Sequence, residues 1–269
     1  MQYDDIAFEL DQGIAVITLD RPEHLNAWSG KMGAELGHAY RRCDEDDDVR
    51  VVVLTGAGSA FCAGADLTSR ETTFASPDPA TFSAAAVSPP AWEVRKPVIA
   101  AMNGHAIGLG LTLALQCDLR IAANEGRYGV LQVRRGVMPD AYSHWTLPRI
   151  VGMERAADLL LTGRKIDGRE ACQMGLAGRS LPAEEVLPAA IETARDIALN
   201  TAPLSVAITK RLLWESPCLT ADEVGRRETA LHHHLMGRAD ALEGVMAWVE
   251  RRPPAWKLSV KNDWPSWPT

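Results

Sequence analysis

The sequence predicts an α/β fold with a helical region at its carboxyl-terminal end. In the first half of the chain, short apolar runs that suit buried strands alternate with segments of helical period. From Met153 onward, the apolar residues recur mostly at helical spacing. We therefore expect an α/β core over residues 1–200 and a helical region with a tail over residues 201–269.

The composition is that of a globular protein. The chain has 269 residues, 46% of them hydrophobic, which is enough to bury one substantial core. The formal net charge is -7 and the Lys and Arg residues form no basic run, so we expect no nucleic-acid partner. The five cysteines have no C-x-x-C spacing, which argues against a zinc site and favours a reducing compartment. No apolar stretch is long enough to span a bilayer, so we expect a cytoplasmic protein without a membrane partner.

The first part of the predicted core contains two strands and a helix. Residues 14–19 read IAVITL, a β-branched and apolar run that predicts a strand, and Arg21 and Pro22 predict a turn after it. Residues 32–40 have a helical period, and we expect the acidic residues 44–48 to form a solvated helix end. Residues 50–55 read RVVVLT, which is typical of a strand that is buried on both faces.

The middle of the chain is expected to pass through loop, strand and helix in turn. Residues 68–95 are rich in Thr, Ser, Ala and Pro, which predicts a long loop or a weak helix that selects a ligand. Val98–Met102 is a predicted strand that leads into the glycine-rich residues 103–110. Residues 111–117 are expected to be helical and residues 118–123 to form a strand.

The helical end carries three predicted apolar stripes, with Pro203 and Pro217 at the breaks between helices. The stripes consist of Ala157, Leu160 and Leu161, of Val206 and Leu213, and of Leu242, Val245, Met246 and Val249. The tail after them contains Trp256, Trp264 and Trp267. We expect this tail either to cover a neighbouring subunit or to pack loosely on the surface.

Two glycine-rich stretches each follow a predicted buried strand. They are FCAGADL at residues 61–67 and GLGLTLALQCD at residues 108–118. Small residues let the backbone approach a ligand, and N–H groups at a helix start can converge on one oxygen to form an oxyanion hole. Tight turns and close helix–strand packing explain the same glycines. Neither stretch is specific by itself.

Taken together and in order, six segments resemble the crotonase superfamily, which includes the enoyl-CoA hydratases and isomerases. The segments are LDRPEHLNAW (19–28), VVVLTGAGSAFCAGADL (51–67), residues 96–123 from KPVIAAMNGHAIGLG onward, LPRIVG (147–152), LLTGRKI (160–166) and ADALEGVMAWVERRPPAW (239–256). The resemblance therefore spans nearly the whole chain. It implies a crotonase-like spiral of βαβ units with carboxyl-terminal helices, assembled as a homotrimer or a hexamer.

The resemblance also implies an acyl-CoA thioester as substrate. Coenzyme A is then part of the substrate, and we expect no separate cofactor and no metal. The N–H groups of Ala65 and Leu109 would hold the thioester oxygen, with Gly110 beside them. The loop that contains Ala63, Asp66 and Leu67 would line the adenine pocket. Leu109 replaces a glycine that is common in hydratases, and the substitution keeps the backbone N–H.

The residues at the catalytic positions of the family differ from those of a hydratase. Hydratases of this family use two glutamates, and this chain has Thr112 and Gln132 at the matching positions. Neither side chain is a general base near neutral pH. Asp140, in GVMPDAYSHW, matches the acid/base carboxylate of isomerases that move a double bond between the 3,4 and 2,3 positions.

A single carboxylate suits an isomerase, because one group can take a proton from C2 and return it to C4. We expect Val137, Tyr142 and Trp145 to make an apolar surround that raises the pKa of Asp140. The alternative is that Asp140 is a turn or cap residue after Pro139.

Tyr142 and His144 are candidate hydrogen-bond donors to the substrate, with packing or exposure as the alternative for each. The expected activity is an enoyl-CoA isomerase with Asp140 as acid/base. Two alternatives stay open. One is an enoyl-CoA hydratase or hydrolase that uses a water oriented by Asp140, and the other is a catalytically silent acyl-CoA-binding protein.

Overall fold

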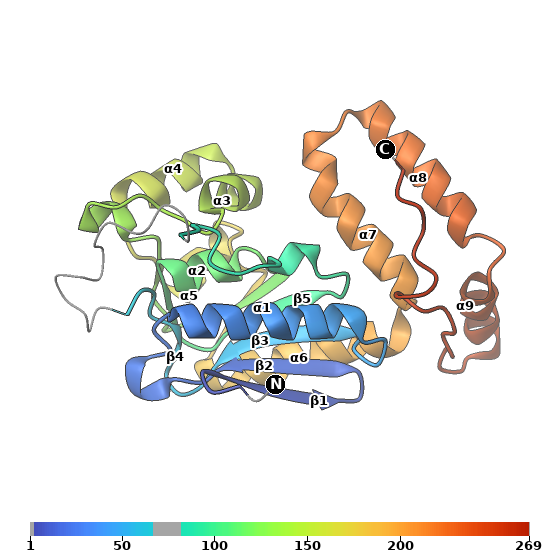
Figure 1. The fold of residues 1–269 in the computed structure, drawn as a ribbon, viewed down its shortest axis with the longest axis horizontal. Coiled ribbons are helices and arrows are strands. Elements are labelled where there is room, and N and C mark those ends of the chain that lie inside the picture. The colour runs from blue at the N-terminus through green and yellow to red at the C-terminus, as the bar shows by residue number, and fades with distance from the viewer. Residues whose placement is uncertain (1–2, 67–81, 269) are drawn as a thin grey trace.

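The computed structural model describes residues 3–66 and 82–268, and it confirms the α/β prediction (Figure 1). Within these residues the main sheet has six strands, in the order β1, β2, β3, β5, β7 and β9. β1 and β2 pair in antiparallel fashion, and the following pairs are parallel. The strands are Ile6–Asp11 (β1), Ile14–Leu19 (β2), Val51–Gly56 (β3), Val98–Met102 (β5), Leu119–Ala123 (β7) and Arg179–Leu181 (β9).

A second, smaller sheet consists of parallel strands that the sequence does not predict. They are β4 (Ala60–Cys62), β6 (His105–Ile107) and β8 (Tyr128–Gly129), and β6 lies between the other two. Runs of two or three residues carry no readable alternation of apolar and polar side chains. This small sheet is nevertheless what positions the two glycine-rich stretches.

Helices α1 (Gly30–Glu45) and α6 (Ala183–Asn200) pack against opposite sides of the main sheet. Val52 of β3 belongs to the core that contains residues of α1, whereas its neighbour Val53 belongs to the core that contains residues of α6. Every residue of β3 is buried. The prediction of a strand buried on both faces is therefore confirmed.

The remaining α-helices belong either to the core or to the carboxyl-terminal arm. Those of the core are α2 (Leu109–Ala114), α3 (Ser143–Val151), α4 (Met153–Thr162) and α5 (Gly168–Gln173), and those of the carboxyl-terminal arm are α7 (Pro203–Glu215), α8 (Ala221–Leu235) and α9 (Ala239–Glu250). The arm extends away from the sheet (Figure 1) and has a small hydrophobic cluster of its own around Leu204, Ile208 and Leu231. Among the helices that the structure describes, none is both long and apolar enough to cross a bilayer.

The predicted stripe on α4 is wrong by one position. The helix buries Ala156, Leu159 and Leu160, while Leu161 is 78% exposed. The apolar residues of this short helix lie on two overlapping faces, so the helical period alone does not decide which face packs.

The stripes on α7 and α9 do not face the core either. Leu213 is 65% exposed, and Leu242, Val245 and Val249 are 66%, 60% and 68% exposed. On α7 the buried face consists of Leu204, Ala207 and Ile208 instead. The apolar face of α9 is real, but no other described part of this chain covers it.

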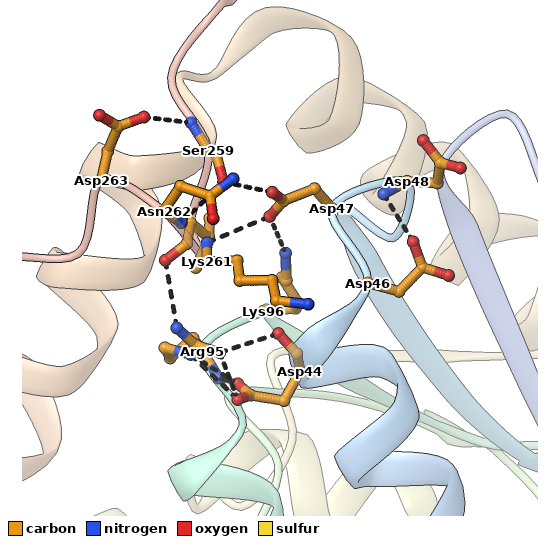
Figure 2. Close-up of polar contacts among 11 residues, drawn as sticks. Asp44, Asp46, Asp47, Asp48, Arg95, Lys96, Ser259, Lys261, Asn262 and Asp263 are labelled. Atoms are coloured by element: carbon orange, nitrogen blue, oxygen red, sulfur yellow. Dashed lines mark hydrogen bonds and ion pairs between the residues drawn. The ribbon is translucent and has the colours of Figure 1, made fainter.

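The acidic residues 44–48 are not simply a solvated helix end (Figure 2). Asp44 pairs with the Arg95 guanidinium at 2.7 Å, and Asp47 lies 3.5 Å from the Lys96 ammonium group. Asp47 also accepts hydrogen bonds from the Ser259 hydroxyl and the Lys261 N–H group. These contacts tie the tail to the core.

Candidate active site

The carboxyl-terminal ends of the three strands of the small sheet bring the candidate residues together. Cys62 of β4 pairs with Ala106 of β6, and Ile107 of β6 pairs with Gly129 of β8. Because the strands are parallel, the residues that follow them emerge at the same edge. Ala65, Leu109 and Gln132 therefore lie on three adjacent segments.

Glycines let the first two segments touch. A Cβ atom on Gly64 would lie 2.6 Å from the Ile107 carbonyl oxygen, and one on Gly110 would lie 2.2 Å from the Cys62 carbonyl oxygen. Both distances are too short for any side chain to be tolerated. The close-packing explanation of these glycines is therefore correct, and it also brings the segments of Ala65 and Leu109 next to each other.

Leu109 is the first residue of α2. Gly108, just before it, has φ 54° and ψ −120°, a conformation that an L-residue with a side chain rarely adopts. This turn starts the helix directly after β6, and the first N–H groups of a helix have no acceptor within the helix. The N–H group of Leu109 is therefore available at the edge of the small sheet.

Ala65 is held by the segment that precedes α1. The Trp28 N–H group donates to the Gly64 carbonyl oxygen at 2.7 Å, and Trp28 forms an isolated bridge with Ala65. Asn26 fixes the turn before Trp28, because its side-chain amide donates to the carbonyl oxygens of Ala57 and Ala60. The LNAW part of the first family-like segment thus supports the loop of Ala65.

Asp140 lies beside Gln132. The Gln132 Nε2 group donates a hydrogen bond to Asp140 Oδ1 at 3.1 Å. Burial raises the pKa of Asp140, while the hydrogen bonds from Gln132 and from its own backbone N–H oppose that rise. Burial thus acts on the pKa in the expected direction, and the expectation that Val137, Tyr142 and Trp145 provide it stays a prediction. Gln132 also packs against the Leu109 loop, since a Cβ atom on Gly108 would lie 3.6 Å from its amide nitrogen and oxygen.

The backbone after Asp140 is strained. Ala141 and Tyr142 have φ values of 46° and 62°, although neither is glycine. Each such residue costs about 1–3 kcal/mol, and such strain is concentrated at functional sites. The turn is held by hydrogen bonds from the Ala141 N–H to the Ala84 carbonyl and from the Gln116 amide to the Ala141 carbonyl. No side-chain hydrogen bond caps α3, so the Asp140 carboxylate does not serve as its helix cap.

Three buried polar atoms around this turn have no hydrogen-bond partner in the described structure: Gln132 Oε1, Gln116 Oε1 and Ser143 Oγ. Buried polar atoms are almost always paired in folded proteins, with protein groups or with water. The Gln132 oxygen lies on the same side-chain amide that holds Asp140. It is an open acceptor next to the candidate base.

The other predicted site residues are placed as follows. Thr112 is fully buried, and its hydroxyl donates to the Leu109 carbonyl oxygen at 3.1 Å. Asp66 forms an ion pair with Arg21 at 3.1 Å. The Ala63 N–H group donates to the Leu25 carbonyl oxygen, and Gly110 is buried in α2.

Tyr142 is 41% exposed and packs edge-to-face on Trp92, with 4.8 Å between the ring centroids. His144 is exposed. Leu67 lies outside the described residues, as do residues 68–81 of the predicted loop. The substrate-binding roles of these residues, and of Thr112, Asp66 and Ala63, stay predictions.

Sequence reasoning missed two contributions to the site. It did not assign Gln132 as the partner of Asp140, although a glutamine in place of a carboxylate was visible. It also missed Trp92, which lies in a short 3-10 helix (Ala91–Glu93) at the end of the predicted loop. Within the described residues, no group of three or more His, Cys, Asp or Glu side chains could hold a metal ion.

Comparisons with known proteins agree with this geometry. Residues 9–259 match the family model described as enoyl-CoA hydratase/isomerase. The chain is 36% identical over 259 residues to a probable enoyl-CoA hydratase of Mycobacterium tuberculosis, covering 94% of this chain and 98% of that protein. It is 36% identical over 248 residues to the carnitinyl-CoA dehydratase of Proteus mirabilis, covering 90% and 94%. A crystal structure of a probable enoyl-CoA hydratase/isomerase from Mycobacterium abscessus superposes with a TM-score of 0.91, at 53% identity, over 94% of this chain and 98% of that one.

Proposed function

Because this chain belongs to the enoyl-CoA hydratase/isomerase family, we propose that it moves a double bond in an enoyl-CoA thioester from the 3,4 to the 2,3 position. One observation carries the proposal. A partly buried carboxylate, that of Asp140, accepts a hydrogen bond from Gln132 at 3.1 Å beside the loop of Leu109. The two positions where hydratases of the family have glutamates are occupied by Thr112 and Gln132, which are not bases.

In the proposed reaction, Asp140 removes a proton from C2 of the 3-enoyl thioester. The electrons of the broken C–H bond delocalise onto the thioester oxygen, where the N–H groups of Ala65 and Leu109 stabilise the negative charge. Asp140 then returns the proton to C4, and the double bond ends between C2 and C3. The raised pKa strengthens the deprotonated Asp140 as a base.

Hydration of a 2-enoyl thioester is the second candidate. It is favoured by the names of several relatives and by the open Gln132 Oε1 acceptor, which has the position to orient a water beside Asp140. A protein that binds acyl-CoA without turning it over is the third outcome that an assay has to distinguish.

The test is NMR of product formation in D2O with 3-enoyl-CoA and 2-enoyl-CoA, for the wild type and for Asp140→Asn. The variant keeps the shape of the side chain and removes the base, so we expect conversion of the 3-enoyl to the 2-enoyl thioester to fall by at least about 100-fold. Asp158→Asn is the matched control, because the Asp158 carboxylate, on α4, pairs with Arg164 and not with Gln132. Formation of 3-hydroxyacyl-CoA selects the hydratase, and binding without turnover of either substrate selects the silent binder.

A further inference from the structure

A large cavity lies between the α/β core and the carboxyl-terminal arm. Its volume is about 950 Å³, within the range of small-molecule sites. Tryptophans from four separate segments line it: Trp92 before β5, Trp145 of α3, Trp214 of α7, and Trp264 and Trp267 of the tail. The cavity is therefore bounded by both parts of the chain.

Three of these rings form one continuous wall. The ring centroids of Trp92 and Trp145 are 5.1 Å apart, and those of Trp92 and Trp214 are 5.6 Å apart. Trp145 and Trp214 are stacked, with 5.6 Å between centroids and an angle of 18° between planes. All three side chains are only partly buried, so part of the wall faces the cavity.

The wall reaches the neighbourhood of Asp140. Tyr142, two residues after Asp140, packs edge-to-face on Trp92 at 4.8 Å. Two residues span at most about 7 Å of chain. A group attached to the carbon chain of a thioester at Asp140 can therefore extend onto Trp92 and its neighbours.

Most of the charged residues that line the cavity are paired with protein groups. Lys210 binds Asp118 at 2.8 Å and also donates to the Ala91 carbonyl oxygen. Glu215 accepts from Arg211 and Arg227 at 2.9 Å and 2.6 Å. Because these charged groups already have partners, we expect a ligand to gain most of its binding free energy from contact with the aromatic faces.

The tail side of the cavity, which contains Trp264 and Trp267, is anchored to the core by contacts of the neighbouring tail residues (Figure 2). Arg95 donates to the Val260 carbonyl oxygen at 3.1 Å, and its guanidinium lies 5.5 Å from the ring centroid of Trp264. Trp264 and Trp267 stack at 5.8 Å. Together with the Asp47 contacts of Ser259 and Lys261, these interactions hold the far side of the cavity in place.

We propose that this tryptophan-lined cavity binds the distal end of the acyl group, and that the substrates preferred by the enzyme carry an aromatic ring there. The inference rests on the proposed function for the identity of the thioester. Flat rings stack on indole faces and lose few rotamers on binding, whereas a linear chain of equal carbon number loses many.

The first test measures binding, so it does not depend on the reaction. Isothermal titration calorimetry compares three saturated thioesters: hexanoyl-CoA, dodecanoyl-CoA and 6-phenylhexanoyl-CoA. We expect 6-phenylhexanoyl-CoA to bind at least about tenfold more tightly than hexanoyl-CoA and about threefold more tightly than dodecanoyl-CoA, which has the same number of acyl carbons. Equal or weaker binding than dodecanoyl-CoA overturns the inference.

Variants localise the preference. Trp92→Leu is expected to abolish the preference for the phenyl thioester over dodecanoyl-CoA. Trp214→Phe keeps a ring at a second position of the wall, and we expect it to reduce the same preference. This variant replaces Trp92→Leu in the test if Trp92→Leu does not fold. Trp256→Leu is the matched control in the tail outside this cavity, and we expect it to leave the preference unchanged. A preference that survives both wall variants overturns the inference.

Kinetics separate this inference from the proposed function. NMR assays of hex-3-enoyl-CoA and 6-phenylhex-3-enoyl-CoA report turnover. A ring preference in binding without isomerisation of either substrate supports the cavity inference and refutes the isomerase. Isomerisation of both substrates at equal kcat/KM, with no ring preference in binding, refutes the cavity inference and leaves the isomerase standing.

Discussion

At the scale of single residues, the site depends on two opposing influences on Asp140. Burial raises the pKa of the carboxyl group above its ordinary value of 3.8, and the Gln132 N–H group lowers it by stabilising the carboxylate. A base acts in its deprotonated form, so activity is lost as the pH falls through that pKa. The Gln132 amide therefore extends the proposed reaction to lower pH, and its hydrogen bond orients Asp140.

Replacing Gln132 tests this role. Gln132→Leu removes the donor, which raises the pKa of Asp140 further and moves the acidic limb of the kcat/KM profile to higher pH. We expect the midpoint of this limb to rise by about one pH unit, since a hydrogen bond to a charged group is lost. Gln116→Leu is the control, because the Gln116 amide binds the Ala141 carbonyl and not the Asp140 carboxylate. If the acidic limb of the Gln132→Leu profile stays in place or moves to lower pH, Gln132 is not the donor that lowers the pKa of Asp140.

At the scale of elements, the start of α2 is the decisive feature. Gly108 turns the chain so that Leu109 becomes the first helical residue immediately after β6. This position leaves an N–H group without an intrahelical acceptor, and it is also a helical position at which proline is common. The donor can therefore be deleted without breaking the helix.

Leu109→Pro and Leu109→Ala form a matched pair. Both lose the packing of a side chain that is 7% exposed, but only Pro lacks the N–H group. We expect kcat of Leu109→Pro to be about 100-fold or more below that of Leu109→Ala, as for the loss of one oxyanion-hole donor. Circular dichroism and thermal unfolding check that both variants fold. Equal kcat values for the two would exclude the Leu109 N–H from the oxyanion hole.

At the scale of the whole molecule, the arm presents an apolar surface. Leu242, Val245, Val249 and Trp248 of α9 are between 60% and 84% exposed. Exposed apolar patches of this kind usually mark contacts between proteins, and soluble oligomers are mostly symmetric assemblies of one chain. We expect α9 to contribute to contacts between copies of this chain, in the homotrimer or hexamer that the family resemblance implies.

A charge on α9 tests the assembly. We expect Leu242→Lys to shift the mass measured by light scattering from the oligomer towards the monomer, because an ammonium group is costly to bury in an apolar contact. Met153→Lys, on α4 of the core, makes an equivalent change at a residue that is 73% exposed. We expect this control to leave the mass unchanged. An unchanged mass for Leu242→Lys would mean that α9 lies outside the interface.

Local patterns account for the parts of the fold that the sequence predicted well. The strands at Ile14–Leu19 and Val98–Met102 match residue for residue, since a run of buried β-branched side chains bounded by turn residues is visible in a short window. The stripes on α4 and α9 show the limit of such patterns. Helical period reveals an apolar face, but only packing decides whether this chain covers it.

The sequence by itself determined the α/β class, the glycine-rich segments and the absence of hydratase glutamates at two positions, because these depend on residue type and order alone. Only the tertiary structure decided that Gln132 binds Asp140, that Gly64 and Gly110 bring two loops into contact, and that Trp92, Trp145 and Trp214 form one wall. Those contacts join residues from different strands, turns and helices. Their partners are selected by how the sheets and the arm pack, and no local spacing encodes that choice.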